Sequence, residues 1–147
     1  MPDFVPMSFE PPRTFAGPGF RLEPLDPSHN EGDYEAWTSS MAHIRSTPGE
    51  WRDWPHEMTL EANLSDLEKH AREFVNREAF TYSILDGDRV IGCLYIYPDK
   101  QGDDDAHVSS WVTASRAEMD RIVWRSVTRW LEDEWPFDSF RYAERSP

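Results

Sequence analysis

Two strand-like segments joined by the turn Asp86-Gly87-Asp88 constrain the fold of this chain more than any other feature. Residues 80–85 (FTYSIL) and 89–97 (RVIGCLYIY) are rich in β-branched and aromatic side chains. An Asp-Gly pair between two such segments signals a tight hairpin, because glycine adopts the positive φ that the turn requires. A second polar turn at 100–105 (KQGDDD) leads into 106–113 (AHVSSWVT), which reads as a third strand. The middle of the chain is therefore predicted to be an antiparallel meander.

Helical periodicity flanks this meander on both sides. Apolar residues at spacings of three and four predict a helix across residues 30–45, and a second helix across 60–75 with Thr59 as its N-cap. A third helix starts near Met119 and is closed by Trp135-Pro136. The apolar faces are Tyr34, Trp37, Met41 and Ile44; then Leu60, Leu64, Leu67, Ala71, Phe74 and Val75; then Met119, Val123, Val127, Trp130 and Leu131.

Short strands at 20–25 (FRLEPL) and 139–144 (SFRYAE) complete the predicted order β-α-α-β-β-β-α-β. The fold class is thus α+β, with an antiparallel meander and one terminal β-α-β crossover. We expect that crossover to be right-handed and its two strands to be parallel.

Residues 1–19 hold five of the twelve prolines, with Phe4, Phe9 and Phe15 between them. Proline fixes φ and removes a hydrogen-bond donor, so this segment is expected to be an extended arm ahead of a single domain at 20–147. The last strand has no following hairpin, so its outer edge is expected to be bare. We expect the arm to cover that edge, within the chain or by exchange in a two-fold homodimer, and we favour the homodimer.

The chain of 147 residues carries 28 acidic and 15 basic side chains, a formal net charge of −13. Nucleic acid and anionic membranes bind through Lys and Arg, so both are disfavoured as partners. A cationic ligand is favoured, although an acidic surface also serves solubility alone. The only cysteine, Cys93, is expected to be buried, and a cytoplasmic location is the default. Neither the five histidines nor Asp103–Asp105 have the spacing of a metal site.

The segment from Arg89 to Val112 resembles the GNAT superfamily of acyl-CoA-dependent N-acetyltransferases. The hairpin FTYSILDGDRVIGCLYIYP, with Gly92 in mid-strand, is similar to the paired strands before that family's cofactor site. AHVSSWV is similar to the family's fourth strand, where His107 stands at a position that often holds a glutamate. The preceding strand and two helices are in the family's order, so the resemblance covers about residues 20–144.

This resemblance implies transfer of an acetyl group from acetyl-CoA to an amine, and a cationic small molecule is the acceptor class that we expect. It implies His107 as the base, Tyr142 as a substitute acid, and a thioester carbonyl held by backbone N–H groups around Trp111 and Val112. The other implied cofactor-binding residues are Thr113, Ser115, Arg116 and Arg121, and those of the acceptor pocket are Glu50, Trp51, Asp53, Trp54 and Glu57. An alkylammonium there would meet cation–π contacts and acidic side chains.

Two departures from the family's pattern support a different function. The turn after the fourth strand usually carries R/Q-x-x-G-x-G/A, but residues 113–121 (TASRAEMDR) contain no glycine and place Glu118 and Asp120 where a phosphate would bind. The family's further helix, with its tyrosine acid, and its last hairpin have no counterpart before Pro147. The alternative is therefore a GNAT-shaped acidic binding or assembly protein without CoA-dependent catalysis.

Overall fold

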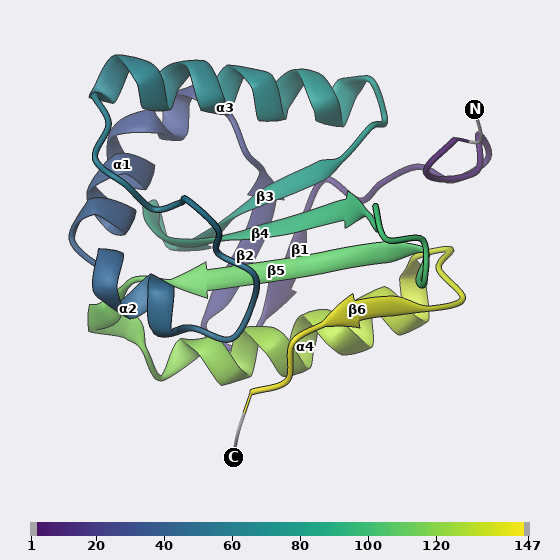
Figure 1. The fold of residues 1–147 in the computed structure, drawn as a ribbon. Helices are drawn as coiled ribbons and strands as arrows, with labels where there is room; N and C mark the ends of the chain where they lie inside the picture. Colours follow the sequence, from purple (N-terminus) through teal and green to yellow (C-terminus); the bar gives the residue numbers. More distant parts are fainter. Residues whose placement is uncertain (1–2, 146–147) are drawn as a thin grey trace.

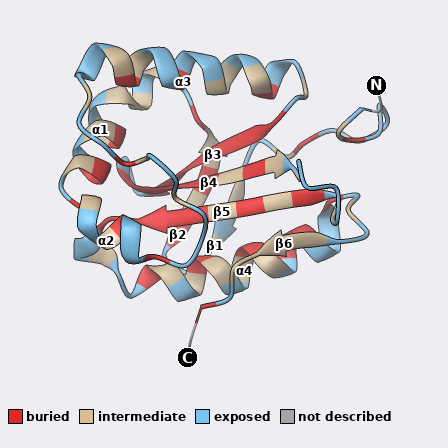
Figure 2. Cartoon of the chain, viewed as in Figure 1, coloured by how far each residue is buried: buried red, intermediate tan, exposed pale blue. Residues whose placement is uncertain are grey.

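The predicted hairpin is the centre of the sheet in the computed structural model, which describes residues 3–145. Strands β3 (Phe80–Asp86) and β4 (Arg89–Pro98) pair antiparallel, and Gly87 in the turn has φ +61°. β5 (Ala106–Val112) continues the meander on the other side of β4. These three strands carry most of the buried residues of the sheet (Figure 2). The predicted meander is confirmed.

The sheet has six strands in the order β1-β2-β3-β4-β5-β6 (Figure 1). β1 (Phe15–Gly17) and β2 (Phe20–Pro24) are antiparallel to their neighbours, whereas β6 (Phe140–Tyr142) runs parallel to β5. The α+β class, the antiparallel meander and the parallel last pair are as predicted. β1 is an additional strand at the edge of the sheet, and it lies within the segment that we expected to be an extended arm.

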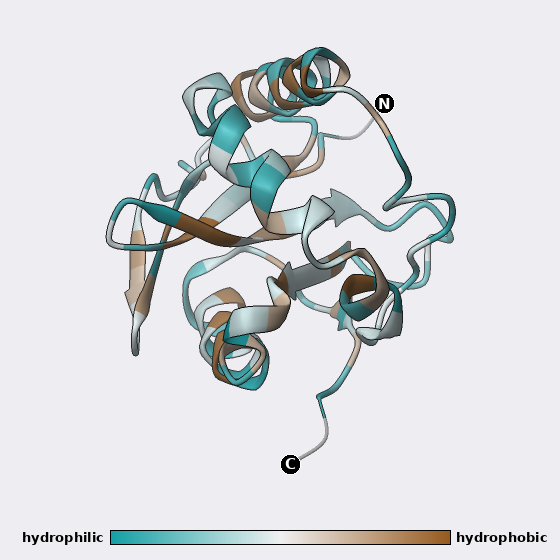
Figure 3. Cartoon of the chain, turned by 90° about the vertical axis from the view of Figure 1, so that its left-hand side faces the viewer, coloured by the Kyte–Doolittle hydropathy of each residue, from teal (hydrophilic) through white to brown (hydrophobic). Residues whose placement is uncertain are grey.

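Helices cover both faces of this sheet (Figures 1 and 3). On one face lie α1 (Asn30–Thr38), α2 (Met41–Ser46) and α3 (Leu60–Val75), and on the other lies α4 (Met119–Glu134). Alternation along β4 places Cys93 in the core under α1 and α3, and Leu94 in the core against α4. Cys93 is 1% exposed, as expected, and burial raises the pKa of its thiol.

The predicted helix across residues 30–45 is divided into α1 and α2 at Ser39-Ser40. Ser40 is buried, and its hydroxyl accepts a hydrogen bond of 2.8 Å from the backbone N–H of Ala114. This long-range bond and the 2.8 Å contact between the Ser40 and Thr113 hydroxyls hold Ser40 in place, and the helix is interrupted there. The next helix matches its prediction: Thr59 caps α3 by accepting from the N–H of Ala62 at 3.0 Å.

The arm packs on the α4 side of its own chain, so the expectation that it covers the last strand within the chain is wrong. Phe4 stacks on Phe80 and Phe137, and Phe15 on Trp130, while β1 pairs with β2 at the opposite edge of the sheet from β6. These rings pack against the core cluster that α4 forms with its face of the sheet. Pro2, also counted in the arm, lies outside the described residues.

Two short helical turns, η1 (Pro27–His29) and η2 (Ala114–Arg116), link these elements. Among residues 3–145, no helix has both the length and the apolar composition needed to cross a membrane.

Candidate functional site

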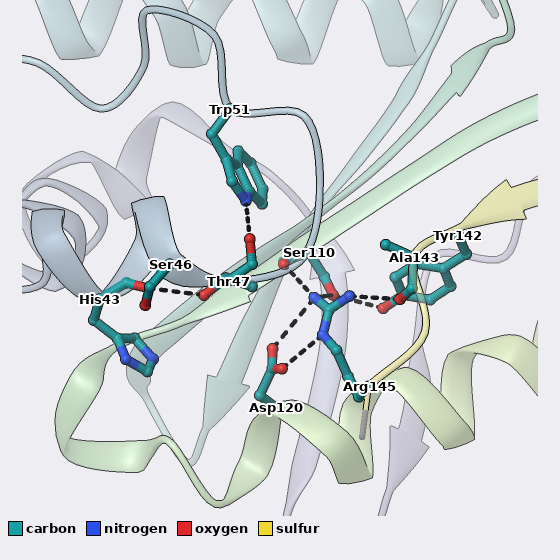
Figure 4. A network of polar contacts seen from close by, with 9 residues as sticks. All are labelled: His43, Ser46, Thr47, Trp51, Ser110, Asp120, Tyr142, Ala143 and Arg145. Atoms are coloured by element: carbon teal, nitrogen blue, oxygen red, sulfur yellow. Dashed lines mark hydrogen bonds and ion pairs between the residues drawn. The ribbon is translucent and has the colours of Figure 1, made fainter. Parts of the chain in front are cut away.

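A cavity of about 520 Å³ lies on the sheet face covered by α1–α3, between the loop that follows α2 and strands β4, β5 and β6. Most side chains that we predicted for the acceptor pocket line this cavity: Glu50, Trp51, Asp53 and Trp54, together with His107. Glu57, predicted with them, is not among the lining residues. The loop is held in place by hydrogen bonds from the Trp51 indole to the Thr47 carbonyl (2.9 Å; Figure 4) and from the Tyr34 hydroxyl to the Met58 carbonyl (2.7 Å).

The wall of this cavity is aromatic. Trp54 lies 6.1 Å from Trp51 and 5.8 Å from Trp111 between ring centroids, and Trp51 lies 6.3 Å from Tyr95. The Trp111 indole N–H donates to the Tyr95 hydroxyl at 3.0 Å, which fixes the orientation of both rings. Trp51 and Trp54 are half-buried, so each packs inward and still presents a ring surface to the cavity.

Arg141 of β6 neutralises two of the acids around the cavity. Its guanidinium donates to Glu50 at 2.8 Å and to Asp99 at 3.1 Å. The hydrogen bond from Arg141 holds the pKa of Glu50 below its ordinary value. Glu50 is therefore already engaged within the chain, and Asp53 is the predicted pocket acid that remains in the cavity.

His107 stands between Tyr97 of β4 and Arg141 of β6 in the register of the sheet, on the cavity face. Partial burial and the neighbouring guanidinium lower the pKa of its imidazole, and Glu50 and Asp99 only partly offset this. The side chain is therefore neutral at pH 7 and is able to accept a proton.

The pairing of β5 with β6 ends before β5 does, and we call this unpaired part of the β5 edge the gap. The register ends at Val108 and Tyr142, so residues 109–112 of β5 have no strand on that side within the described chain. The N–H of Thr113 donates to β4, at the Ile91 carbonyl (2.8 Å). Because backbone groups alternate along a strand, those of residues 110 and 112 point into the gap.

Arg145 fills part of this gap (Figure 4). Its guanidinium donates to the Ser110 carbonyl at 2.9 Å and forms an ion pair of 2.6 Å with Asp120 in the first turn of α4. Tyr142 lies beneath it, with its hydroxyl 2.5 Å from the Ser110 hydroxyl. Burial raises the pKa of Tyr142, so the phenol keeps its proton at neutral pH.

The residues predicted to bind the cofactor do not gather around one cavity. Trp111 and Val112 are buried in the sheet, so only their backbone could contribute. Thr113 and Ser115 line a separate space of about 550 Å³ beside α1. The remaining two residues, both basic, follow on the connection to α4 and on α4 itself, outside the lining of that space: Arg116 and Arg121.

Carboxylates dominate the start of α4, where a phosphate-binding turn is expected. Glu118 is the N-cap residue, its side chain forms no capping hydrogen bond, and Asp120 follows in the first turn. Arg116 is engaged with Asp86 at 2.7 Å and with Glu118 at 3.5 Å. Arg121 is exposed and has no ion pair with any described residue. The turn offers little unopposed positive charge to a pyrophosphate.

Sequence reasoning missed several residues of the cavity. His70 of α3 and the β4 residues Tyr95 and Tyr97 line it, and Arg141 bridges its acids. The register of β4 with β5 could have placed Tyr97 opposite His107, because the turn between these strands was predicted. His70 lies three residues after Leu67, on the inward side of the predicted helix, which was a usable signal.

No protein-family model matches the chain, and no curated protein matches it. Solved structures do. The ribosomal-protein-S5-alanine acetyltransferase from Vibrio fischeri is 16% identical, with a TM-score of 0.63 over 81% of this chain and 65% of that one. RimJ from Mycobacterium smegmatis, in complex with CoA-disulfide, is 19% identical, with a TM-score of 0.60 over 90% of this chain and 63% of that one.

The microcin C7 self-immunity acetyltransferase MccE, solved with acetyl-CoA and AMP, is 16% identical, with a TM-score of 0.61 over 78% of this chain and 62% of that one. This chain therefore spans less than two thirds of the length of these three structures. The fold implied by the sequence resemblance is confirmed: the chain has the fold of the GNAT acetyltransferases.

Proposed function

We propose that this protein is an N-acetyltransferase that transfers the acetyl group of acetyl-CoA to an amine bound in the cavity. The observation that carries the proposal is the gap beside β5. Ser109 lines the amine cavity and also begins the stretch of β5 that lacks a partner strand on the β6 side, so the cavity and the gap meet there. An extended pantetheine chain beside residues 109–112 could satisfy their unpaired backbone groups.

Backbone and side chains at this junction have the chemistry that acyl transfer requires. The N–H groups of residues 110 and 112 point into the gap and could polarise a thioester carbonyl. His107, neutral at pH 7, takes a proton from the bound amine, and Tyr142, whose phenol holds its proton at neutral pH, protonates the leaving thiolate. Acetyl-CoA supplies the activated acetyl group. Binding against Ser110 requires Arg145 to leave the Ser110 carbonyl.

The phosphate end of acetyl-CoA fits less well than its pantetheine arm. Arg121, with no ion pair among the described residues, would be its principal charge partner. Arg116 would have to exchange Asp86 and Glu118 for a phosphate. These carboxylates favour weak binding of CoA, and they are the specific observation behind the second candidate function, a GNAT-shaped acidic binding or assembly protein. In that case the bare outer edge of β6 would serve a homodimer.

The aromatic wall favours a small-molecule amine as the acceptor. A cationic amine would lie against Trp51 and Trp54 and near Asp53. The bases Arg52 and Lys100 also line the cavity, so the aromatic rings and not net charge would provide most of the selectivity. The single buried cysteine fits a cytoplasmic location, which is part of the proposal.

Release of free CoA thiol from acetyl-CoA tests the function directly, with phenethylamine, spermidine and an unblocked peptide as acceptors. We expect turnover with phenethylamine, which combines an ammonium group with an aromatic ring. His107→Gln should lower this turnover by about 10²-fold to 10⁴-fold. His43→Gln is the matched control, because His43 is not a cavity residue. Absence of thiol release with all three amines would favour the binding protein.

A further inference from the structure

Besides His107 and the loop residue His56, a histidine of α3 lines the amine cavity. His70 lies on α3, and its side chain is 20% exposed. Its Nδ1 atom lies 3.3 Å from Glu73 Oε1, 3.2 Å from the Tyr97 hydroxyl and 3.4 Å from the Thr81 hydroxyl. One edge of the imidazole is therefore surrounded by oxygen atoms of the protein, and Nε2, on the other edge, has no hydrogen-bond partner among the described residues.

Glu73 decides which nitrogen of this ring carries the proton. Its Oε1 atom is buried and accepts no hydrogen bond from the described residues, and the ion-pair contact of 3.3 Å with His70 Nδ1 is its approach to a possible donor. A carboxylate oxygen only accepts, and leaving it without a donor in a buried place is costly. Nδ1 is the nearest donor, so the neutral ring is protonated at Nδ1. The lone pair of Nε2 is then available on the cavity side.

The charges around His107 and His70 are opposite in sign. His107 lies beside the Arg141 guanidinium, which disfavours an imidazolium, and Glu50 and Asp99 are already paired with that guanidinium. His70 has Glu73 in contact; among the other groups facing it, Asp66 favours a proton on the ring and Lys69 opposes it, while the uncharged phenols of Tyr95 and Tyr97 close the β4 side.

Burial lowers the pKa of His70 below its ordinary value, and Glu73 partly restores it. The imidazole is therefore neutral before reaction, and the imidazolium that forms has a carboxylate counter-ion. A histidine oriented by a carboxylate through one nitrogen and open to the substrate through the other is the arrangement of a general base.

We propose that His70 is a second general base of the cavity and that Glu73 is its positioning residue. This inference rests on the proposed function. His70 Nε2 takes one proton from the ammonium R–NH₃⁺. The neutral amine then attacks the thioester, so that an N–C bond forms and the C–S bond breaks. The amide nitrogen loses its second proton to His107, Tyr142 protonates the departing thiolate and regains a proton from His107, and His70 returns its proton to solvent. The sum is R–NH₃⁺ plus acetyl-CoA giving R–NH–acetyl, CoA-SH and H⁺.

The first test is the pH profile of kcat/KM with phenethylamine and acetyl-CoA. His70→Gln should lower kcat/KM by about 10²-fold at neutral pH. Glu73→Gln should lower it by about tenfold and move the acid limb to lower pH, because the imidazolium loses its counter-ion. A histidine with a merely structural role would not move the acid limb. Full turnover by folded His70→Gln, beside an active wild type, would overturn the inference and leave the proposed function intact.

The second test needs no turnover. Diethyl pyrocarbonate acylates neutral, accessible imidazole nitrogens, and mass spectrometry of the whole protein's digest assigns the modified histidine. We expect His70 to react above its pKa, to be protected by phenethylamine, and to react in Glu73→Gln with a lower pH midpoint. If the wild type shows no acetyl transfer but His70 reacts in this way, the proposed function fails and the His70–Glu73 assignment stands. An unreactive His70 in native protein, with reactive His107, would overturn the assignment.

Discussion

Replacing Arg145 with alanine is expected to destabilise the protein by about 3 kcal/mol. The Arg145 side chain is 3% exposed, and it donates to Asp120 at 2.6 Å, to the Ser110 carbonyl at 2.9 Å and to the Ala143 carbonyl at 2.7 Å. Removal of one partner of a buried ion pair costs about 3–5 kcal/mol, because the other charge stays uncompensated. The Asp120 side chain is 19% exposed, so solvent screens part of its charge. The expected loss therefore lies at the lower end of that range.

Thermal unfolding measures this loss. For a chain of this size, about 3 kcal/mol corresponds to a decrease in Tm of roughly 6–12 °C. A double-mutant cycle with Asp120→Asn separates the energy of the Arg145–Asp120 pair from that of the other Arg145 contacts. The double variant should be more stable than the sum of the two single losses predicts, by about 1–2 kcal/mol. If Arg145→Ala unfolds within about 2 °C of the wild type, the guanidinium does not occupy the gap and the reasoning is refuted.

Three further predictions concern the sheet, the core and the start of α4. Gly92→Ala should destabilise by about 1–3 kcal/mol in urea unfolding, because its Cβ would overlap the Trp111 carbonyl oxygen; an unchanged midpoint would contradict that close approach. Burial raises the pKa of Asp33 from 3.8 to about 6, so the folded state binds the extra proton and stability falls as pH rises across that window. Asp33→Asn should therefore stabilise the protein at about pH 7.5 and not at about pH 4; equal effects at both would argue against a raised pKa. Arg116→Glu should weaken CoA binding by more than tenfold in calorimetry, and an unchanged Kd would exclude Arg116 from the phosphate site.

Local sequence signals predicted the elements whose stability is local. The Asp86-Gly87-Asp88 turn gives the central hairpin, and Thr59 caps α3 as its sequence position indicated. The break at Ser39-Ser40 was missed because the Ser40 hydroxyl binds Ala114, far along the chain. The same applies to the arm: its prolines predicted an extended path but carried no information on which sheet edge β1 would join.

The candidate site was predictable where one loop carries it. Trp51 and Trp54 lie in a single segment, so their common place in the cavity followed from order along the chain. The pairs Arg145–Asp120 and Arg141–Glu50 join residues 25 and 91 positions apart, and neither spacing is a recognisable pattern. The geometry of both pairs depends on where the pairing of β6 with β5 ends, and no local sequence pattern predicts that point.

Calorimetric titration with acetyl-CoA tests most directly whether the gap between β5 and β6 is an acyl-CoA site. The matched pair is the wild type and the double variant Asp120→Asn/Arg145→Ala, which removes one charge of each sign and clears the Ser110 carbonyl. We expect both to bind, and the double variant to bind about tenfold more tightly, because the charge-assisted bond of about 1.5–3 kcal/mol no longer has to be broken. Absence of binding heat for both folded proteins at millimolar acetyl-CoA would contradict the proposed function.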